Sequence, residues 1–542
     1  MSSVTATSSS RVLQCLELCR LICEQIGSKD KRTLFQLCLS CKALMEPALD
    51  LLWYELDDLV PLMRCLPLDL YEEREDLQRD VVLIVSNGFH SAPLIFTINL
   101  RPMVKNDWER FEIAASRVHI LTHSDIADVT RNDRVYQFDS GIFQSLACAQ
   151  PGTSKLLPRL RQLTWSVKND DIYPYILLFL SPSIKDLTVF IVTGDDASVR
   201  MRFSLLTSLV SHCPSIQSVA LDAQDHVYRS WESLYSGRAS SACAPFIAWT
   251  GLESLSLRHL NLGFLTHAIA GLPALTRLEL YSCRIRVDTQ FPSNTPQFPV
   301  LKDLAMVRCN MGTCLHVLKS MSSTPLVSIN LSIAETPQEP QWAELINGLQ
   351  NGVLHDTLTD FVISSMASRR PVTLPFQTIS PLLRFWHIHS FGVYDYCTLD
   401  VDDDDVACIA KAWSQLRMFA MRPKKPVPTR LTSHVLIPFA KHCLELEELS
   451  LTINAATPDN YEEKLGDGMC NRKLWKLGVN DSSIDNPGRV AAFISDIFPE
   501  VRKIVVSIPD GDPEGKKRKW EEVERLIPVF AAVRKQEANR KT

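Results

Sequence analysis

The chain repeats one short pattern of apolar and polar positions over most of its length. From Leu160 onward, an apolar residue is followed by two variable positions, a second apolar residue, one variable position and a third apolar residue. The copies made of leucine alone are Leu252-Leu255-Leu257, Leu275-Leu278-Leu280 and Leu446-Leu449-Leu451. Weaker copies begin at Leu160, Ile184, Ile216, Leu301, Leu326, Leu358, Leu383, Leu416, Leu474 and Val501. Successive starts lie between 23 residues (252 to 275) and 36 residues (216 to 252) apart, which predicts a repeat of variable length.

The segments between these copies have helical periodicity. One apolar face is formed by Cys314, Leu315, Val317, Leu318 and Met321. Proline ends several segments just before the next copy, at Pro214, Pro273 and Pro499. Each repeat is therefore expected to be a strand, a turn, a helix and a return. Stacked repeats of this kind form a parallel sheet on the concave side, with helices on the convex side.

Two copies extend the pattern further. Leu280 is followed by Cys283 and Ile285, and Met306 is followed by Cys309 and Met311. Over about Leu160 to Ile508 the chain therefore resembles the leucine-rich-repeat family, whose longer consensus has asparagine or cysteine at this point. The expected fold is α/β, with a small helical module followed by an irregular leucine-rich-repeat solenoid.

The N-terminal part has a different pattern and predicts a bundle of three short helices. Their apolar faces are Leu18, Leu21, Ile22 and Ile26; then Leu34, Leu37, Cys38, Cys41 and Leu44; then, after Pro47, Leu49, Leu52, Trp53 and Leu56. Seven short segments of this region carry a resemblance to a known family. They are Leu16–Ile22, Leu37–Leu44, Glu46–Trp53 and Leu59–Pro67, with the pairs Arg101-Pro102, Asp107-Trp108 and Arg110-Phe111. At these residues the sequence resembles an F-box, and more closely the F-box-like proteins of mushroom-forming fungi.

The resemblance implies a substrate receptor of a Skp-cullin-F-box ubiquitin ligase. The helical module would bind a Skp-type adaptor and its cullin complex, and the repeats would bind a protein substrate. The residues placed at the adaptor interface by position are Leu18, Ile22, Leu37, Cys41 and Trp53. Leu16 stands where the family usually has proline. That departure favours the alternative, a leucine-rich-repeat interaction scaffold without ubiquitin-ligase docking.

Five segments are expected along the chain. They are a disordered tail over residues 1–11, the helical module over 12–70, a connecting region over 71–158, the solenoid over 159–510, and a basic link with a C-terminal helix over 511–542.

Strand alternation predicts which side chains reach the concave face, because the residues that flank the inward apolar positions point the other way. They are Phe190, Arg258, Arg277, Glu279, Tyr281, Phe385, His387, His389, Arg422, Glu448 and Lys476. Aromatic residues and arginines are enriched among interface hot spots. We therefore expect substrate to bind at Arg258, Tyr281 and Phe385, with His387 and His389 at the rim.

Two groups of residues have a spacing that would suit metal ligands. At both places the surrounding sequence favours a structural role instead. Cys38 and Cys41 form a C-x-x-C pair near three further cysteines, yet all five fall at helical intervals among Leu and Ile without a nearby histidine. His387 and His389 fit exposed strand positions equally well. We expect no metal and no cofactor.

Composition narrows the remaining classes of function. The net charge of −5 gives no general attraction to nucleic acid or anionic membranes. The sixteen cysteines lack a repeated spacing, which indicates reduced, mostly buried thiols and not a framework of disulfides. The longest apolar runs are far shorter than the roughly 20 residues of a membrane span. Glycine-rich phosphate loops and the common hydrolase and metalloprotease motifs are absent from the sequence. We expect a non-enzymatic protein of the cytoplasm, the nucleus or both.

Two charged runs are expected to precede helices. The acidic run Asp402–Asp405 is expected to lead into a helix over about Val406–Trp413, because negative charge favours a helix N-terminus. The basic run Lys516–Lys519 is expected to be a solvated link before an amphipathic helix that begins at Trp520. A nuclear-import signal is the alternative for the basic run.

Overall fold

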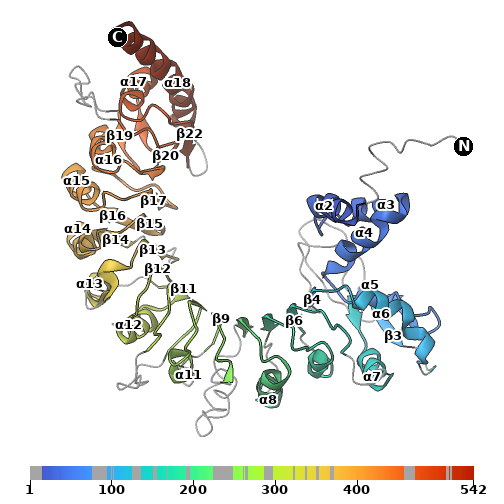
Figure 1. Cartoon of the computed structure of the whole chain (residues 1–542). Helices are drawn as coiled ribbons and strands as arrows, with labels where there is room; N and C mark the ends of the chain where they lie inside the picture. The colour runs from blue at the N-terminus through green and yellow to red at the C-terminus, as the bar shows by residue number, and fades with distance from the viewer. Residues whose placement is uncertain are drawn as a thin grey trace, which may run out of the picture. The chain divides into compact units, whose positions relative to one another are not determined.

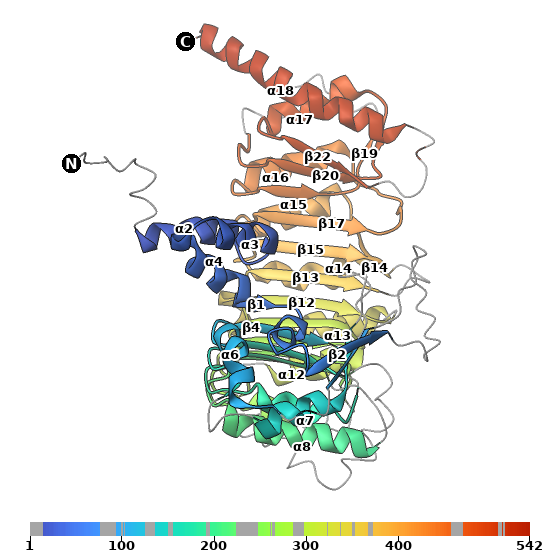
Figure 2. The ribbon, with the colours of Figure 1, turned by 90° about the vertical axis from the view of Figure 1, so that its right-hand side faces the viewer.

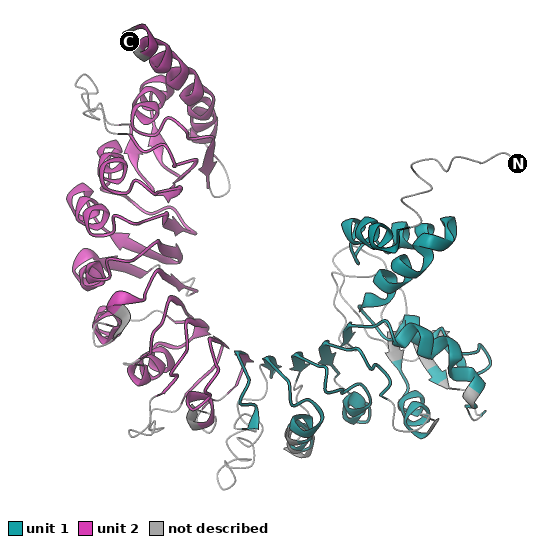
Figure 3. Ribbon diagram, viewed as in Figure 1, with its two compact units in different colours: residues 1–254 teal, residues 255–542 magenta. Residues whose placement is uncertain are grey.

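The structure is a computed structural model of the whole chain. It describes residues 15–75, 94–98, 101, 103–124, 136–149, 155–167, 169–190, 196–223, 248–260, 262, 266–285, 297–321, 324–335, 338–349, 353–366, 372–456, 470–507, 512 and 515–541. The expected tail over residues 1–11 lies outside these ranges. Two compact units are present, Met1–Ser254 and Leu255–Thr542 (Figure 3).

The first unit begins with three helices and continues into a parallel sheet (Figure 1). The order of strands in this sheet is β1-β4-β6-β7-β8. A smaller sheet pairs β2 with β3 antiparallel and β3 with β5 parallel. The elements of this unit are α2 (Leu16–Ile26), α3 (Lys31–Ser40), α4 (Lys42–Tyr54), β1 (Glu55–Leu56), α5 (Val60–Met63), β2 (Tyr71–Glu75), β3 (Leu94–Ile98), η1 (Lys105–Trp108), α6 (Glu109–Ala115), β4 (Ile120–Ser124), β5 (Tyr136–Phe138), α7 (Ser140–Ala149), β6 (Gln162–Ser166), η2 (Tyr173–Leu178), β7 (Asp186–Phe190), α8 (Asp196–His212) and β8 (Ser218–Asp222).

The parallel sheet begins before the expected boundary at residue 159. Strand β1 pairs with β4, and β4 pairs with β6. The copy of the repeat pattern at β4 reads Val118-Leu121-His123. The histidine in the third apolar position conceals this copy from a search for apolar residues.

The second unit is a longer stack of the same kind, with strands on its inner side and helices on its outer side (Figures 1 and 2). Its main strand order is β9-β10-β11-β12-β13-β15-β17-β18-β20-β22. The elements are β9 (Ser254–Arg258), α11 (Thr266–Ala270), β10 (Arg277–Tyr281), β11 (Asp303–Cys309), α12 (Met311–Ser320), β12 (Ser328–Ile333), α13 (Glu339–Leu349), η4 (Val353–Asp356), β13 (Asp360–Ser365), β14 (Val372–Pro375), α14 (Phe376–Ile379), η5 (Ser380–Arg384), β15 (Ser390–Asp395), β16 (Cys397–Asp400), α15 (Asp403–Ala412), β17 (Met418–Pro423), η6 (Ser433–Val435), α16 (Leu436–His442), β18 (Glu448–Ser450), β19 (Asn454–Ala455), β20 (Lys476–Asn480), β21 (Ser483–Ile484), α17 (Pro487–Ile497), β22 (Lys503–Val506) and α18 (Lys516–Lys541).

Parallel pairing aligns the inward apolar residue of each strand with that of the next. In the second unit the aligned residues are Leu278, Leu304, Ile329, Phe361, Phe391, Phe419, Leu449, Leu477 and Ile504. All of them are buried. A one-residue slip would turn every one of these side chains away from the core, so the alignment specifies the register. The fold is the predicted α/β leucine-rich-repeat architecture.

Twelve of the thirteen sequence copies have the predicted register, and the copy at Leu383 does not. Strand β15 begins at Ser390, and its pattern is Ile388-Phe391-Val393, five residues later than we predicted. Residues Ser380–Arg384 form a 3₁₀ helix instead. The error arose because Leu383, Trp386 and Ile388 imitate the spacing by chance.

Cysteine thiols and phenylalanine rings connect neighbouring repeats in the second unit. The Cys283 thiol donates to the Leu257 carbonyl at 3.1 Å, and the Cys309 thiol donates to the Leu280 carbonyl at 3.4 Å. These bonds explain why the consensus has asparagine or cysteine here, since both can donate to the preceding repeat. The Phe391 ring lies between Phe361 and Phe419, with centroids 6.2 and 5.6 Å away.

Side-chain caps begin several of the helices. Asp402 caps α15 by accepting from the amide of Asp405, whose carboxylate accepts from the amide of Asp402 in return. The acidic run is therefore the first turn of this helix, which begins at Asp403, three residues before the expected start. This reciprocal arrangement satisfies two amides that have no partner within the helix.

The basic run also belongs to a helix and is not the solvated link that we expected. Helix α18 starts at Lys516, whose amide donates to Asp512. The ammonium groups of Lys516 and Lys519 donate to the carbonyls of Asp481 and Ile484 in the last repeat. Two of these lysines thus attach the terminal helix to the solenoid.

Candidate interaction surfaces

The three-helix module has a small core and an unusually apolar exterior. Its core consists of Cys19, Cys23, Leu34, Leu44 and Ala48. Seven of the seventeen exposed large apolar side chains in the described part of the chain lie within this short module. They are Leu16, Leu18, Leu21, Ile22, Phe35, Leu39 and Met45. Such a concentration of apolar side chains marks an interaction surface, because single exposed leucines are common but clusters are not.

The five residues predicted at the adaptor interface fall into two groups. Leu18 and Ile22 project from α2 and are 42% and 40% exposed. Leu37 and Cys41 are partly buried and pack against the module core. Trp53 on α4 is half-buried. Sequence periodicity could not separate the two groups, because both faces of these helices are apolar. The exposed Leu21, Phe35 and Leu39 were not among the predicted residues.

A cluster around Tyr281 lies on the strand side of the second unit. The guanidinium carbons of Arg258 and Arg308 lie 5.6 and 5.9 Å from the centre of the Tyr281 ring. Arg308 also donates to the Tyr281 hydroxyl at 3.2 Å, and the His259 ring meets the tyrosine edge-on at 5.3 Å. Arg258 pairs with Glu279 at 3.3 Å. The cluster combines a positioned aromatic ring with guanidinium groups, a composition typical of interface hot spots.

The backbone holds this cluster in place. His259, Ser282 and Arg308 occupy the same position in three consecutive repeats, two residues after the third apolar residue, and have positive φ angles of 58°, 49° and 54°. His259 and Ser282 directly follow β9 and β10, whereas Arg308 lies near the end of β11, where the pairing with β12 shifts register. Residues other than glycine adopt this conformation only where the surroundings require it. The turn therefore sets the direction in which each of these side chains leaves the sheet.

Phe385 is not on the concave surface, and its prediction as a substrate-binding residue was wrong. Its side chain is fully buried and stacks on the His355 ring at 4.9 Å. The five-residue error in register explains this result. His387 and His389 consequently precede β15 instead of flanking its inward residues. The Nε2 atom of His389 lies 3.2 Å from the Gln415 side-chain oxygen, and His387 contacts the exposed Trp386.

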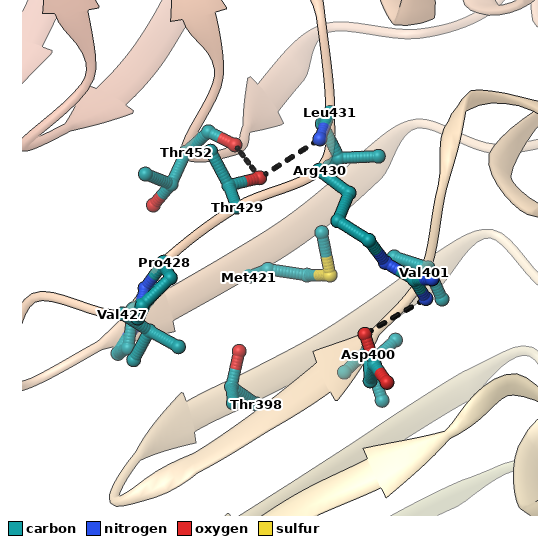
Figure 4. Close-up of a pocket in the computed structure, with 12 residues that line it drawn as sticks. Thr398, Asp400, Val401, Met421, Val427, Pro428, Thr429, Arg430, Leu431 and Thr452 are labelled. Atoms are coloured by element: carbon teal, nitrogen blue, oxygen red, sulfur yellow. Dashed lines mark hydrogen bonds and ion pairs between the residues drawn. The ribbon is translucent and has the colours of Figure 1, made fainter.

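A shallow hollow in the second unit is too small for a metabolite. It lies among Thr398, Met421, Thr429 and Arg430 (Figure 4) and has a volume of about 30 Å³. Small-molecule sites usually measure several hundred Å³. Arg430 closes one side through an ion pair with Asp400 at 2.8 Å, so the hollow has room only for water.

Buried thiols in the described residues are poor nucleophiles and poor metal ligands. Burial raises the pKa of Cys213 and of Cys309 to about 11 and that of Cys314 well above its usual value. These groups stay protonated at neutral pH, whereas reaction and coordination require the thiolate. No cluster of three His, Cys, Asp or Glu residues suited to a metal ion occurs among the residues that the structure describes. In the same residues, no helix is long and apolar enough to cross a membrane.

Comparisons with known proteins give a fold likeness alone. No family model and no curated protein matches the sequence. A chain from the crystal structure of the Rad7 and Elc1 complex in yeast is 13% identical, with coverage of 63% of this chain and 82% of that chain and a TM-score of 0.32. An internalin from Listeria monocytogenes is 11% identical, with coverage of 65% and 82% and a TM-score of 0.33. A leucine-rich-repeat protein from Leptospira interrogans is 11% identical, with coverage of 69% and 90% and a TM-score of 0.33. At these scores, the likeness carries no argument about partners.

Proposed function

We propose that this chain is a non-catalytic substrate receptor of a Skp-cullin-F-box ubiquitin ligase, at work in the cytoplasm, the nucleus or both. The observation that carries the proposal is the apolar exterior of a helical module whose sequence resembles an F-box. A three-helix bundle with Leu18, Leu21, Ile22, Phe35 and Leu39 exposed has apolar surface that a partner helix can cover. The repeats supply a separate, extended surface for the substrate.

No catalytic step is assigned to this chain. In such a ligase, the receptor would contribute proximity and orientation between the substrate and the transferring enzyme. Arg258, Tyr281 and Arg308 are the residues that we propose for substrate contact, because a positioned tyrosine between two arginines suits a hot spot.

Adaptor docking can be tested with two charges on α2. The double variant Leu18→Asp/Ile22→Asp should lose co-purification of a Skp-type adaptor and keep its melting temperature, because neither side chain belongs to the module core. Lys42→Asp is the matched control, since it places the same charge on an exposed polar position of the module. Deleting the module is a poorer test, because β1 directly follows α4 and pairs with β4.

Equal adaptor recovery with the parent and the double variant would refute docking through α2. The alternative, an interaction scaffold without ligase docking, predicts a different result. The parent would then capture protein partners through the repeats and no adaptor at all.

Substrate contact has its own test. Tyr281→Ala should reduce the set of proteins captured by the full chain without a change in melting temperature or adaptor recovery. Lys319→Ala, on the outer helix α12 and 61% exposed, is the control for the opposite face. Unchanged capture by Tyr281→Ala, together with a loss for Lys319→Ala, would contradict the placement of the substrate on the strand side.

A further inference from the structure

A cavity in the first unit lies between the helical module and the segments that lead into strands β4 and β6. Its volume is about 230 Å³. The module contributes side chains from α2 and α4, and the repeat side contributes Arg117, His119 and Arg159. The lining residues are Arg20, Glu24, Pro47, Asp50, Leu51, Tyr54, Arg117, His119 and Arg159.

Contacts between the two sides hold the cavity in shape. Arg117 forms ion pairs with Glu46, at 2.5 Å, and with Asp50 on α4. The rings of Tyr54 and His119 stack at 4.7 Å, and the His119 amide donates to the Tyr54 carbonyl at 2.9 Å. These contacts link helix α4 to the start of β4, so the cavity is preformed.

The residues that line the cavity carry an excess of positive charge. Three arginines line it against two carboxylates, Glu24 and Asp50. Asp50 is already paired with Arg117. Arg20 and Arg159, both exposed, form no ion pair in the part of the chain that the structure describes. Two guanidinium groups from opposite sides therefore face one space with Glu24 as the remaining carboxylate.

We propose that this cavity binds a small phosphate-bearing anion. Guanidinium groups donate in a planar fork that matches phosphate oxygens, and a tetrahedral phosphate presents oxygens to both sides at once. The volume equals that of about eight waters at roughly 30 Å³ each, enough for a pyrophosphate or triphosphate group. Tyr54, Pro47 and Leu51 supply the uncharged part of the lining.

Binding has a structural consequence. Arg20 belongs to the module, and Arg159 precedes β6 on the repeat side. An anion held by both arginines joins the module to the first repeats and reduces movement between them. The cavity is thus a site at which a phosphate compound can stiffen the connection, whether or not the module binds an adaptor.

The test uses the full chain and calorimetric titration with tripolyphosphate at constant ionic strength. We expect one saturable site in the parent protein. The variant Arg20→Ala/Arg159→Ala should bind about tenfold or more weakly, because two charge-assisted contacts are lost. Arg161→Ala is the matched control, since Arg161 is exposed, lies two residues from Arg159 and does not line the cavity. It should bind as the parent does.

Two further arms make the outcome decisive. Arg20→Lys/Arg159→Lys keeps both charges and loses the planar guanidinium donors, so it should bind more weakly than the parent and more tightly than a folded alanine variant. If the alanine variant folds poorly, the comparison of the lysine variant with the parent still tests the proposal. Citrate replaces phosphate oxygens with carboxylates and should bind more weakly than tripolyphosphate. Absence of saturable binding, equal weakening by Arg161→Ala, or equal affinity for citrate would overturn the proposal.

Discussion

His123 offers a sharp test of the repeat register at β4. It occupies the third apolar position of a repeat, where the other copies have an apolar residue, and it is 2% exposed. Its ring lies among Phe138, Phe143 and Trp165, with centroids 5.3, 6.1 and 4.8 Å away. Nδ1 has no hydrogen-bond partner among the described residues. Burial lowers the pKa of His123 to about 3.

The sign of the pH effect follows from this pKa. In the unfolded chain a histidine titrates near about 6.5, so below that pH the unfolded state binds a proton that the folded state does not accept until about pH 3. Stability is therefore fully present above pH 6.5 and falls as the pH decreases toward 3. Between pH 7 and pH 4.5 the loss from this one residue is about 2 to 3 kcal/mol.

The variant His123→Leu should remove this pH dependence. Urea unfolding, followed by hydrogen exchange of the β4 and β6 amides, should show a difference between variant and parent that grows by about 2 to 3 kcal/mol from pH 7 to pH 4.5. All other titrating groups cancel in that difference. At pH 7 the variant should already be more stable by about 1 to 3 kcal/mol, because a buried nitrogen without a partner is removed.

Phe143→Leu is the control in the same aromatic cluster. It replaces a buried ring with a smaller apolar side chain and changes no titrating group. The stability of this variant should therefore differ from that of the parent by the same amount at both pH values. If His123→Leu also kept a constant difference from the parent, His123 would not be buried in its neutral form, and the register at β4 would be wrong.

Three further changes test the packing of the repeats. Leu278→Ala, in the cleanest repeat, should cost about 2 to 5 kcal/mol, and hydrogen exchange should increase chiefly in β9, β10 and β11. Gly478→Ala would bring its Cβ within 2.3 Å of the Ser450 hydroxyl, so it should cost about 1 to 3 kcal/mol in urea unfolding, and Ser450→Gly in the same chain should restore most of that. Arg202→Met should cost about 2 kcal/mol in the first unit, because the buried guanidinium donates to Asp170 and to the Val167 carbonyl; unchanged stability would mean that these bonds add nothing.

The candidate surfaces were only partly predictable from sequence. Alternation along β9 and β10 identified Arg258 and Tyr281. Arg308 was missed because regular alternation along β11 does not anticipate the positive φ of Arg308 at the register shift between Val307 and Cys309. Leu18 and Leu37 belong to equally apolar helices, and only the packed bundle shows that the first is exposed and the second is partly buried. The anion cavity joins Arg20 to Arg159, and no local pattern relates residues so far apart in the sequence.

The sequence by itself determined the repeated architecture, because the same apolar triplet recurs in every repeat and the copies reinforce one another. Each apolar triplet is weak, yet a wrong register in one repeat cannot shift the next, so the error at Leu383 stayed confined to β15. Tertiary structure decided where such copies are hidden and which side chains remain exposed. His123 fills an apolar position only because three aromatic rings surround it, and Phe385 is buried because His355 covers it. Burial depends on contacts between distant residues, and periodicity along one strand or helix contains no information about them.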